Sequence, residues 1–224
     1  ITMEYVEGAT LEHVDLEPHV LAQVILQVCN GLAEAHSRGI VHRDIKPANI
    51  LLTSFAGVSH FAKVVDFGLA RSYEAEGLGK ITAAAEILGS PTYMSPEQIM
   101  GKDPEPRTDL YSLGVILYEM LTGERPFSDD NSVTLCMKQL NDAPPDIEEH
   151  IGTGVVPGDV KEIVDRLLAK DPGGRPASAG AVAAALLSTR ICDRELATQW
   201  TEGKVSGEAG DVLPTRPDIG SMMV

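Results

Sequence analysis

Residues 108–123 (TDLYSLGVILYEMLTG) constrain the fold more than any other stretch of this chain. Apolar side chains occur on nearly every side of the helix that they would form, and such helices lie inside a protein core. Thr108 fits the N-cap position, because its hydroxyl can accept a hydrogen bond from a free N–H group of the first turn. Gly123 fits the end, because glycine adopts the left-handed conformation at little cost. We therefore predict a buried helix between these two residues.

Helical spacing recurs in four other segments. In residues 18–37 the apolar residues from Val20 to Ala35 repeat along one helix face, and Gly39 stands where that helix would end. Further helices are predicted over residues 132–140, 158–170 and 178–188, with the turn sequence DPGGRPAS between the last two.

Short apolar runs predict strands. Residues 1–6 indicate a strand before a turn at Gly8, and residues 61–71 form a compact β-branched run that contains Asp66. Residues 72–95 are rich in Gly, Ala, Ser and Thr, which predicts a long exposed loop of the kind that often carries function. Helices and short strands together predict an α+β fold.

Composition limits the class of protein. The 224 residues are 43% hydrophobic, enough for one domain with a sizeable core, which we place at residues 1–190. The polar, Gly-rich remainder, residues 191–224, is predicted to be a disordered tail or linker.

The net charge of −15 argues against nucleic-acid binding. No signal peptide is visible and no apolar run is long enough to span a membrane, so we expect a cytoplasmic protein. Cys29, Cys136 and Cys192 are widely spaced and should be free and mostly buried.

Residues 42–49 (HRDIKPAN) concentrate polar chemistry between two apolar runs. Asp44 and Asn49 lie in one turn, and Asp66 ends the next strand-like run. If the two short strands pair, these oxygen-bearing side chains meet at one end and suit Mg²⁺. Lys46 adds a positive charge at the same place. A carboxylate, a lysine and a metal site are what phosphoryl transfer requires.

The order of motifs resembles the signature set of protein kinases. HRDIKPAN is followed by DFG at residues 66–68, SPE at 95–97 and a DxxSxG helix start at Asp109. Lysine at the second position after Asp44 resembles the serine/threonine branch. The segments MEYVEG, GSPTYMSPEQ and GERPF are similar in sequence to segments of the eukaryotic-like serine/threonine kinases of bacteria. The resemblance therefore implies a protein-kinase-like fold.

The resemblance implies a role for each matching residue. Asp44 would be the base toward a Ser or Thr hydroxyl, and Lys46 would steady the γ-phosphate of ATP. Asn49 and Asp66 would hold Mg²⁺. The adenine of ATP would meet the gatekeeper Met3, the backbone of Glu4 and Val6, and the side chain of Leu51. The structural positions would be His42 and Phe67 stacking in the interior, Gly68 completing DFG, Asp109 anchoring the 42–49 loop, and Glu97 pairing with Arg175.

Regulation would involve the loop between DFG and SPE. In the family, the arginine at the position of Arg43 receives a phosphate from that loop, which orders it. Thr82 is our candidate phosphosite, because Ser90, Thr92 and Tyr93 lie in the segment that would dock substrate. Ser90 would contact Asp44 and Lys46. Ser95 replaces the usual Ala and Tyr111 the common Trp, and neither change removes chemistry.

The resemblance begins at the hinge of the kinase fold. The sequence contains no G-x-G-x-x-G loop, no strand lysine for the α- and β-phosphates, and no helix glutamate to pair with it. Half of the ATP clamp would be missing, so we expect no meaningful kinase activity from this chain alone. The surface that faces the missing lobe would be exposed and apolar.

Three functions remain open at the level of sequence. The first is a serine/threonine protein kinase with ATP and Mg²⁺ as cofactors and protein substrates as partners. The second is a non-catalytic kinase-like scaffold, which a stop codon just upstream of Ile1 would favour. The third, more remote, is another metal-dependent phosphate enzyme. A full-length kinase could form homodimers, and it would lie at the cytosolic face of a membrane if it carried an anchor outside this chain.

Overall fold

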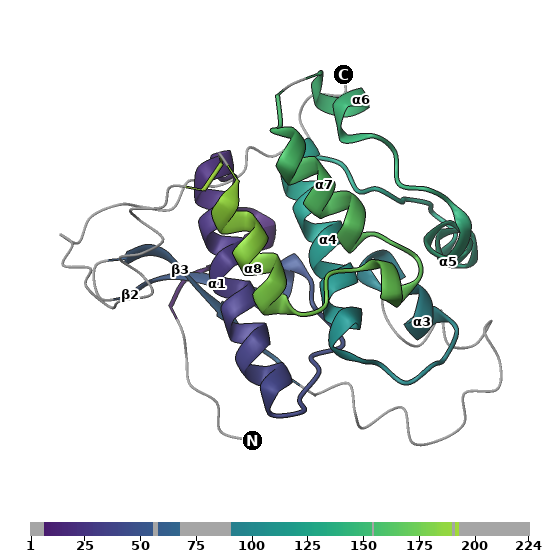
Figure 1. Ribbon diagram of the computed structural model, residues 1–224, viewed down its shortest axis with the longest axis horizontal. Coiled ribbons are helices and arrows are strands. Elements are labelled where there is room, and N and C mark those ends of the chain that lie inside the picture. The colour runs from purple at the N-terminus through teal and green to yellow at the C-terminus, as the bar shows by residue number, and fades with distance from the viewer. Residues whose placement is uncertain (1–6, 56–57, 68–90, 154, 190, 193–224) are drawn as a thin grey trace.

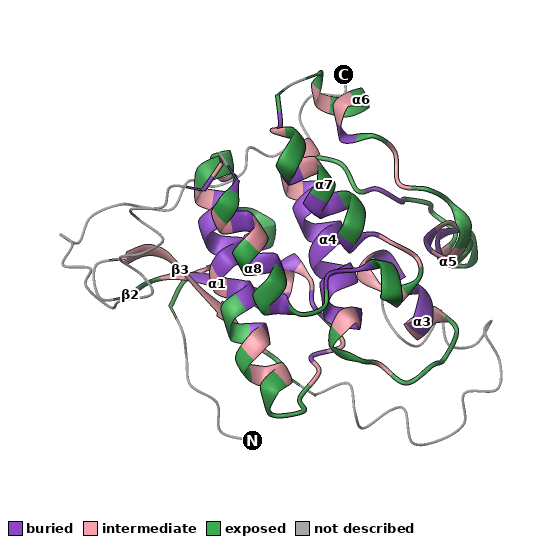
Figure 2. Cartoon of the chain, viewed as in Figure 1, coloured by how far each residue is buried: buried purple, intermediate pink, exposed green. Residues whose placement is uncertain are grey.

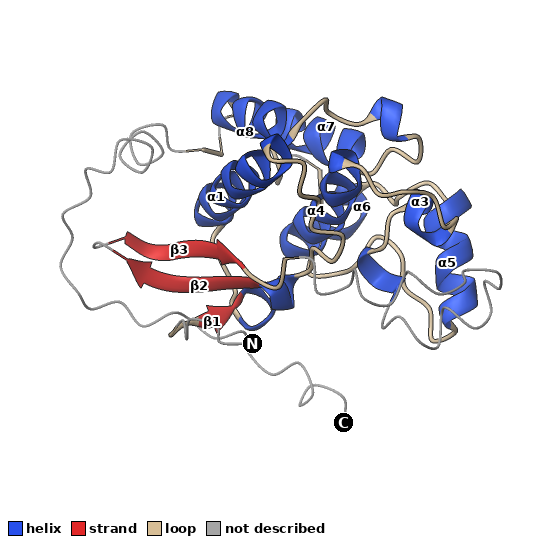
Figure 3. Cartoon of the chain, turned by 90° about the horizontal axis from the view of Figure 1, so that it is seen from below, coloured by secondary structure: helices blue, strands red, loops and turns tan. Residues whose placement is uncertain are grey.

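The computed structural model describes residues 7–55, 58–67, 91–153, 155–189 and 191–192. Helices form the larger part, and a three-stranded antiparallel sheet lies beside helix α1 (Figures 1 and 3). The α+β class expected from the sequence is confirmed.

Helix α4 (Pro106–Thr122) is the central helix of the fold. Every residue from Thr108 to Glu119 is buried, as Figure 2 shows along its length. Four helices pack around it: α1 (Pro18–Ser37), α6 (Ile147–Ile151), α7 (Gly158–Leu167) and α8 (Ala179–Ser188). Helices α3 (Pro96–Ile99) and α5 (Ser132–Asn141) contact each other beside this group. The predicted buried helix is thus the centre of the helical core.

The start of α4 differs from the prediction. Thr108 is not the N-cap: the helix begins at Pro106, with Glu105 as its N-cap. Proline favours the first turn of a helix, because its φ is already helical and its missing N–H would be unpaired there. The Thr108 hydroxyl instead accepts a hydrogen bond from the Glu105 N–H at 3.1 Å, which forms a capping box. Gly123 ends the helix with φ +78°, as predicted.

Gly114 allows α4 and α7 to approach closely. A Cβ atom at Gly114 would lie 2.7 Å from the Cβ of Leu167 and 3.2 Å from its carbonyl carbon. We expect Gly114→Ala to lower the free energy of unfolding by about 1–3 kcal/mol through overpacking. Gly31→Ala on α1 is the matched control, since nothing lies within 4 Å of that position. There we expect a gain of about 0.5–1 kcal/mol, because alanine favours helix. Denaturant unfolding measures both, and equal effects at the two sites would contradict the close approach.

The other predicted helices are present with small shifts at their ends. The helix predicted for residues 158–170 ends at Leu167, and the helix predicted for 178–188 begins after Ser178, whose hydroxyl accepts a hydrogen bond from the Ala181 N–H. The short helices α3 and α6 were not predicted, because segments this short show no clear periodicity.

The sheet has the order β1 (Ala9–Thr10), β2 (Ile50–Phe55), β3 (Val58–Val64). Strand β3 starts and ends earlier than the run predicted at 61–71. Its last residue, Val64, lies opposite Ile50 of β2. The strand predicted for residues 1–6 lies outside the described residues. A Cβ at Gly8 would lie 2.3 Å from the carbonyl oxygen of Leu52, so only glycine lets this segment pass along β2.

Residues 91–95 correct the prediction of an exposed loop over residues 72–95. Pro91, Thr92 and Ser95 are buried. Side chains of the body satisfy the backbone of this segment: the Gln139 amide donates to the Thr92 carbonyl at 2.5 Å, and the Ser112 hydroxyl donates to the Tyr93 carbonyl at 2.7 Å. A polar composition did not reveal that these carbonyls have partners in the interior.

The three cysteines are free and buried, as predicted. Ile191 packs against the core and Cys192 belongs to it, so ordered contacts continue past residue 190. Residues 193–224, predicted to be a disordered tail, lie outside the described part of the chain. Within the described part, no helix has both the length and the apolar character needed to cross a membrane.

Candidate active site

Residues 42–49 connect the end of α1 to β2 and place three polar side chains together. The Asp44 carboxylate oxygen Oδ2 accepts a hydrogen bond from Lys46 Nζ at 2.7 Å and from Asn49 Nδ2 at 3.1 Å. The Asn49 amide also donates to the Asp44 carbonyl at 2.8 Å. Among the described residues nothing donates to the other carboxylate oxygen of Asp44, whose side chain is 50% exposed. With half of its side chain exposed, the Asp44 carboxylate can be reached by a hydroxyl group from outside.

Strand pairing brings Asp66 to the same end of the sheet. Ile50 lies opposite Val64, and the Val65 N–H donates to the Asn49 carbonyl at 3.0 Å. Asp66 is the next residue along β3's extension, and it is exposed. The register therefore places Asp66 at the same end of the sheet as Asn49.

The backbone around the site is unusual. Arg43 has φ +72° and Asp66 has φ +63°, both in the left-handed region. Only one other described non-glycine residue, His60, shares this conformation. Left-handed non-glycine residues carry a cost of about 1–3 kcal/mol and persist only where the surroundings impose them. Both residues therefore need strong external anchors.

Asp109 of α4 is one such anchor. Its carboxylate is fully buried and accepts hydrogen bonds from the backbone N–H groups of His42, at 2.9 Å, and Arg43, at 2.8 Å. His36 Nε2 at the end of α1 lies 2.7 Å from the same carboxylate. The 42–49 loop is thus tied to the central helix. The sequence reasoning missed His36, because nothing local links it to a residue 73 positions away.

His42 connects the two halves of the site. Its ring is buried, its Nε2 lies 2.8 Å from the Val65 carbonyl, and its Nδ1 accepts from the Asp44 N–H at 3.3 Å. A carbonyl only accepts and a backbone N–H only donates, so this geometry requires the neutral tautomer with the proton on Nε2. The ring also contacts Phe67 edge-on, with centroids 4.6 Å apart. His42 acts here in packing and hydrogen bonding.

The residues present fit a Mg²⁺ ion. The Asn49 amide nitrogen is turned toward Asp44, and among the described residues nothing donates to its oxygen. Asp66 supplies an exposed carboxylate at the same sheet end. Two hard oxygen ligands completed by water and phosphate oxygens are typical of Mg²⁺ sites. No group of three or more His, Cys, Asp or Glu side chains gathers as metal ligands in the described part of the chain.

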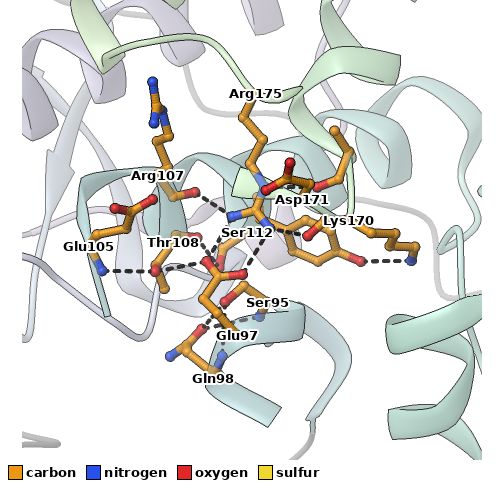
Figure 4. A network of polar contacts seen from close by, with 12 residues as sticks. Ser95, Glu97, Gln98, Glu105, Arg107, Thr108, Ser112, Lys170, Asp171 and Arg175 are labelled. Carbon is orange, nitrogen blue, oxygen red and sulfur yellow. Dashed lines mark hydrogen bonds and ion pairs between the residues drawn. The ribbon is translucent and has the colours of Figure 1, made fainter. Parts of the chain in front are cut away.

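A second polar network joins α3 to the loop between α7 and α8 (Figure 4). Arg175 donates to both carboxylate oxygens of Glu97, at 2.7 and 2.8 Å, across 78 residues. The guanidinium also donates to the carbonyls of Arg107, Ala169 and Lys170. Burial would raise the pKa of Glu97, but the hydrogen bonds and charge of Arg175 outweigh it and lower that pKa. The ion pair expected from the sequence is therefore buried and bidentate.

Tyr93, Glu119 and Arg125 form a cluster that the sequence reasoning missed. The Tyr93 hydroxyl donates to Glu119 at 2.6 Å, and Arg125 lies 3.1 Å from the same carboxylate. Burial and then Glu119 raise the pKa of Tyr93, so the phenol stays protonated. The cluster holds the segment that follows residue 90 against α4.

Of the residues predicted to contact ATP, Leu51 is half-buried on β2. The residues that lie outside the described part are Met3, Glu4, Val6, Gly68, Thr82 and Ser90. Their expected roles remain predictions.

Comparison with known proteins gives the family to which this fold and its 42–49 loop belong. The family model described as "Protein kinase domain" matches residues 1–187. The chain belongs to the protein kinase domain family.

The curated relatives are bacterial kinases. The chain is 38% identical to serine/threonine-protein kinase PknB of Mycobacterium tuberculosis, over 98% of this chain and 36% of that protein. It is 34% identical to serine/threonine-protein kinase pkn3 of Myxococcus xanthus, over 97% of this chain and 40% of that protein. It is 39% identical to PknL of M. tuberculosis, over 83% of this chain and 46% of that protein. The chain spans less than half the length of each of these relatives.

Proposed function

We propose that this chain is the helical, substrate-binding part of a serine/threonine protein kinase that transfers the γ-phosphate of ATP to Ser or Thr hydroxyls of proteins. One observation carries the proposal. The Asp44 carboxylate is held on one oxygen by Lys46 and Asn49, and its side chain is 50% exposed, so that an incoming hydroxyl can reach it.

Each residue of the loop then has a defined task. Asp44 accepts the proton of the attacking hydroxyl, and its orientation is kept by two hydrogen bonds. Lys46, which lies beside it, offers positive charge to the transferring phosphoryl group. Asn49 and Asp66 are the protein ligands that would hold Mg²⁺, which neutralises charge on the phosphates when bound. Asp109 and His42 keep the loop in its left-handed path.

The proposal also covers the residues that would contact ATP and those that would regulate the enzyme. Leu51 would pack below adenine, with Met3, Glu4 and Val6 beside it. Arg43 would receive a phosphate on Thr82, and Ser90 would favour Ser or Thr acceptors. The relatives named as serine/threonine-protein kinases support this choice of acceptor.

Metal-dependent nucleotide binding tests the site. In the full-length natural protein that carries this sequence, we expect Asp66→Ala to weaken binding of Mg²⁺·ATP by about tenfold or more, because a charged ligand is lost. Asp103→Ala, an exposed acid in the loop before α4, is the control and should bind normally. Titration calorimetry with and without Mg²⁺ measures both. Unchanged Mg²⁺·ATP affinity in Asp66→Ala would remove Asp66 from the proposed metal site.

A further inference from the structure

The side-chain amide of Gln98 joins two segments that are 55 residues apart in the sequence. Gln98 lies on α3, directly after the SPE triplet, and its Nε2 donates to the carbonyl of Arg43 at 2.8 Å. This carbonyl belongs to the peptide group that leads into Asp44. No motif in the sequence assigns a role to Gln98.

The orientation of this amide is fixed by its other partners. Its oxygen accepts hydrogen bonds from the Ser95 N–H at 3.1 Å and from the Ser95 hydroxyl at 3.2 Å. Because a backbone N–H can only donate, the oxygen must face Ser95 and the amide nitrogen must face Arg43. The Ser95 hydroxyl in turn lies 3.4 Å from the Gln98 N–H, which completes a capping box (Figure 4).

Ser95 occupies a position where the kinase signature usually has alanine. Its hydroxyl makes a hydrogen bond to the Gln98 amide oxygen that alanine could not make. Ser95 is fully buried and contacts Gln98 through both its backbone N–H and its side-chain hydroxyl. Alanine would keep the backbone contact and lose the hydroxyl contact. The Ser95 hydroxyl therefore adds a second contact to the backbone N–H that already fixes the rotation of the Gln98 amide.

The Arg43 carbonyl needs such a partner. Arg43 adopts φ +72°, and Asp109 fixes only the N–H side of this residue and of His42. The peptide between Arg43 and Asp44 is planar, so the direction of its C=O determines the direction of the Asp44 N–H and of the bond to its Cα. Gln98 holds that C=O, while the long 3.3 Å contact to His42 Nδ1 holds the N–H.

We propose that Gln98, oriented by Ser95, is a positioning residue that holds the peptide before Asp44 and so aims the catalytic carboxylate. The proposal rests on the proposed kinase function for its effect on turnover. The Gln98 amide also couples the segment after residue 90 to the 42–49 loop.

Gln98→Glu isolates this contact. Glutamate keeps the acceptor for Ser95 and remains a good capping-box residue, so α3 should still form. Its second carboxylate oxygen would face the Arg43 carbonyl oxygen, and two acceptors repel each other. In the full-length natural protein we expect kcat for phosphoryl transfer to fall by about 10- to 100-fold, because a small misplacement of a catalytic group has effects of this size. KM for ATP should change by no more than about twofold, since the metal ligands are untouched.

Gln27→Glu is the matched control. Gln27 on α1 makes the same kind of contact, donating to the His60 carbonyl at 3.2 Å and accepting from the Ala62 N–H at 3.0 Å. The chemical change is identical, but it breaks a bond between α1 and β3. We expect lower stability with kcat retained.

Backbone hydrogen exchange provides a readout that does not depend on activity. In Gln98→Glu the amides of residues 42–44 should exchange faster than in the unaltered protein, while those of α5 stay unchanged. Normal kcat with normal exchange at 42–44 would overturn the proposal, and so would an equal loss of kcat in Gln27→Glu. If the unaltered full-length protein shows no Asp44-dependent transfer, the kinase function is wrong, and hydrogen exchange still decides whether Gln98 holds this peptide.

Discussion

Asp44→Asn is expected to lower kcat for phosphoryl transfer by about 10²- to 10⁴-fold, the range typical of losing a general base. The amide can keep the contacts that position it, because its oxygen can still accept from Lys46 and Asn49. It cannot take a proton from a substrate hydroxyl. The geometry would therefore survive while the proton transfer is lost.

Nucleotide binding separates this effect from unfolding. We expect Asp44→Asn to bind Mg²⁺·ATP nearly normally, because Asn49 and Asp66 are unchanged. The assay follows transfer of labelled phosphate to a protein substrate by the full-length natural protein, since this chain spans less than half the length of its relatives. Asp165→Asn is the control, because Asp165 also pairs with a lysine, Lys161 at 3.2 Å, but lies on the exposed face of α7. Near-normal turnover in Asp44→Asn would show that another group is the base.

Arg175→Met is expected to produce the largest loss of stability, about 3–5 kcal/mol, because it leaves a charged partner buried and unpaired. The side chains of Arg175 and Glu97 are 0% and 5% exposed. Without the arginine, the Thr108 hydroxyl, at 2.9 Å, is the one side-chain donor that the described residues still offer to the Glu97 carboxylate. Glu97→Gln should lose less, because Arg175 would still donate to three backbone carbonyls.

Two further variants make this expectation specific. The double variant Arg175→Met with Glu97→Met should be more stable than Arg175→Met alone, since no charge is left buried. The exposed Arg38–Glu34 pair on α1 is the control, and Arg38→Met should change stability by no more than about 1 kcal/mol. Equal losses at Arg175 and Arg38 in chemical denaturation would contradict a special role for the buried pair.

The buried pair also has a pH signature. Contact with Arg175 holds the pKa of Glu97 below its usual 4.5, despite burial that acts in the opposite direction. A lowered folded-state pKa means that the stabilisation is complete above the unfolded-state value and is lost as the pH falls through the folded-state value. The stability difference between the unaltered protein and Glu97→Gln should therefore be constant near neutral pH and shrink below about pH 4.5.

Local patterns predicted the parts of this fold that depend on local physics. The burial of α4 and the left-handed stop at Gly123 follow from periodicity and turn chemistry, whereas the pairing of the strands on either side of the site was only a condition until the structure showed it. The start of α4 was misplaced, because proline and threonine both favour helix starts and only the structure shows which one does so here. Residues 91–95 were misjudged because their polar backbone is satisfied by distant side chains.

The sequence by itself determined which chemical groups the 42–49 loop carries, and the order of motifs around them identified the kind of domain. Only the tertiary structure decided what holds those groups in place. His36, Gln98 and Thr108 each act on a partner in a different element, and the helical or strand period of a sequence contains no information about such a partner. The physical reason is that a hydrogen bond depends on distances of about 3 Å and on direction. Such distances between segments tens of residues apart exist only after α4 and its neighbours have packed.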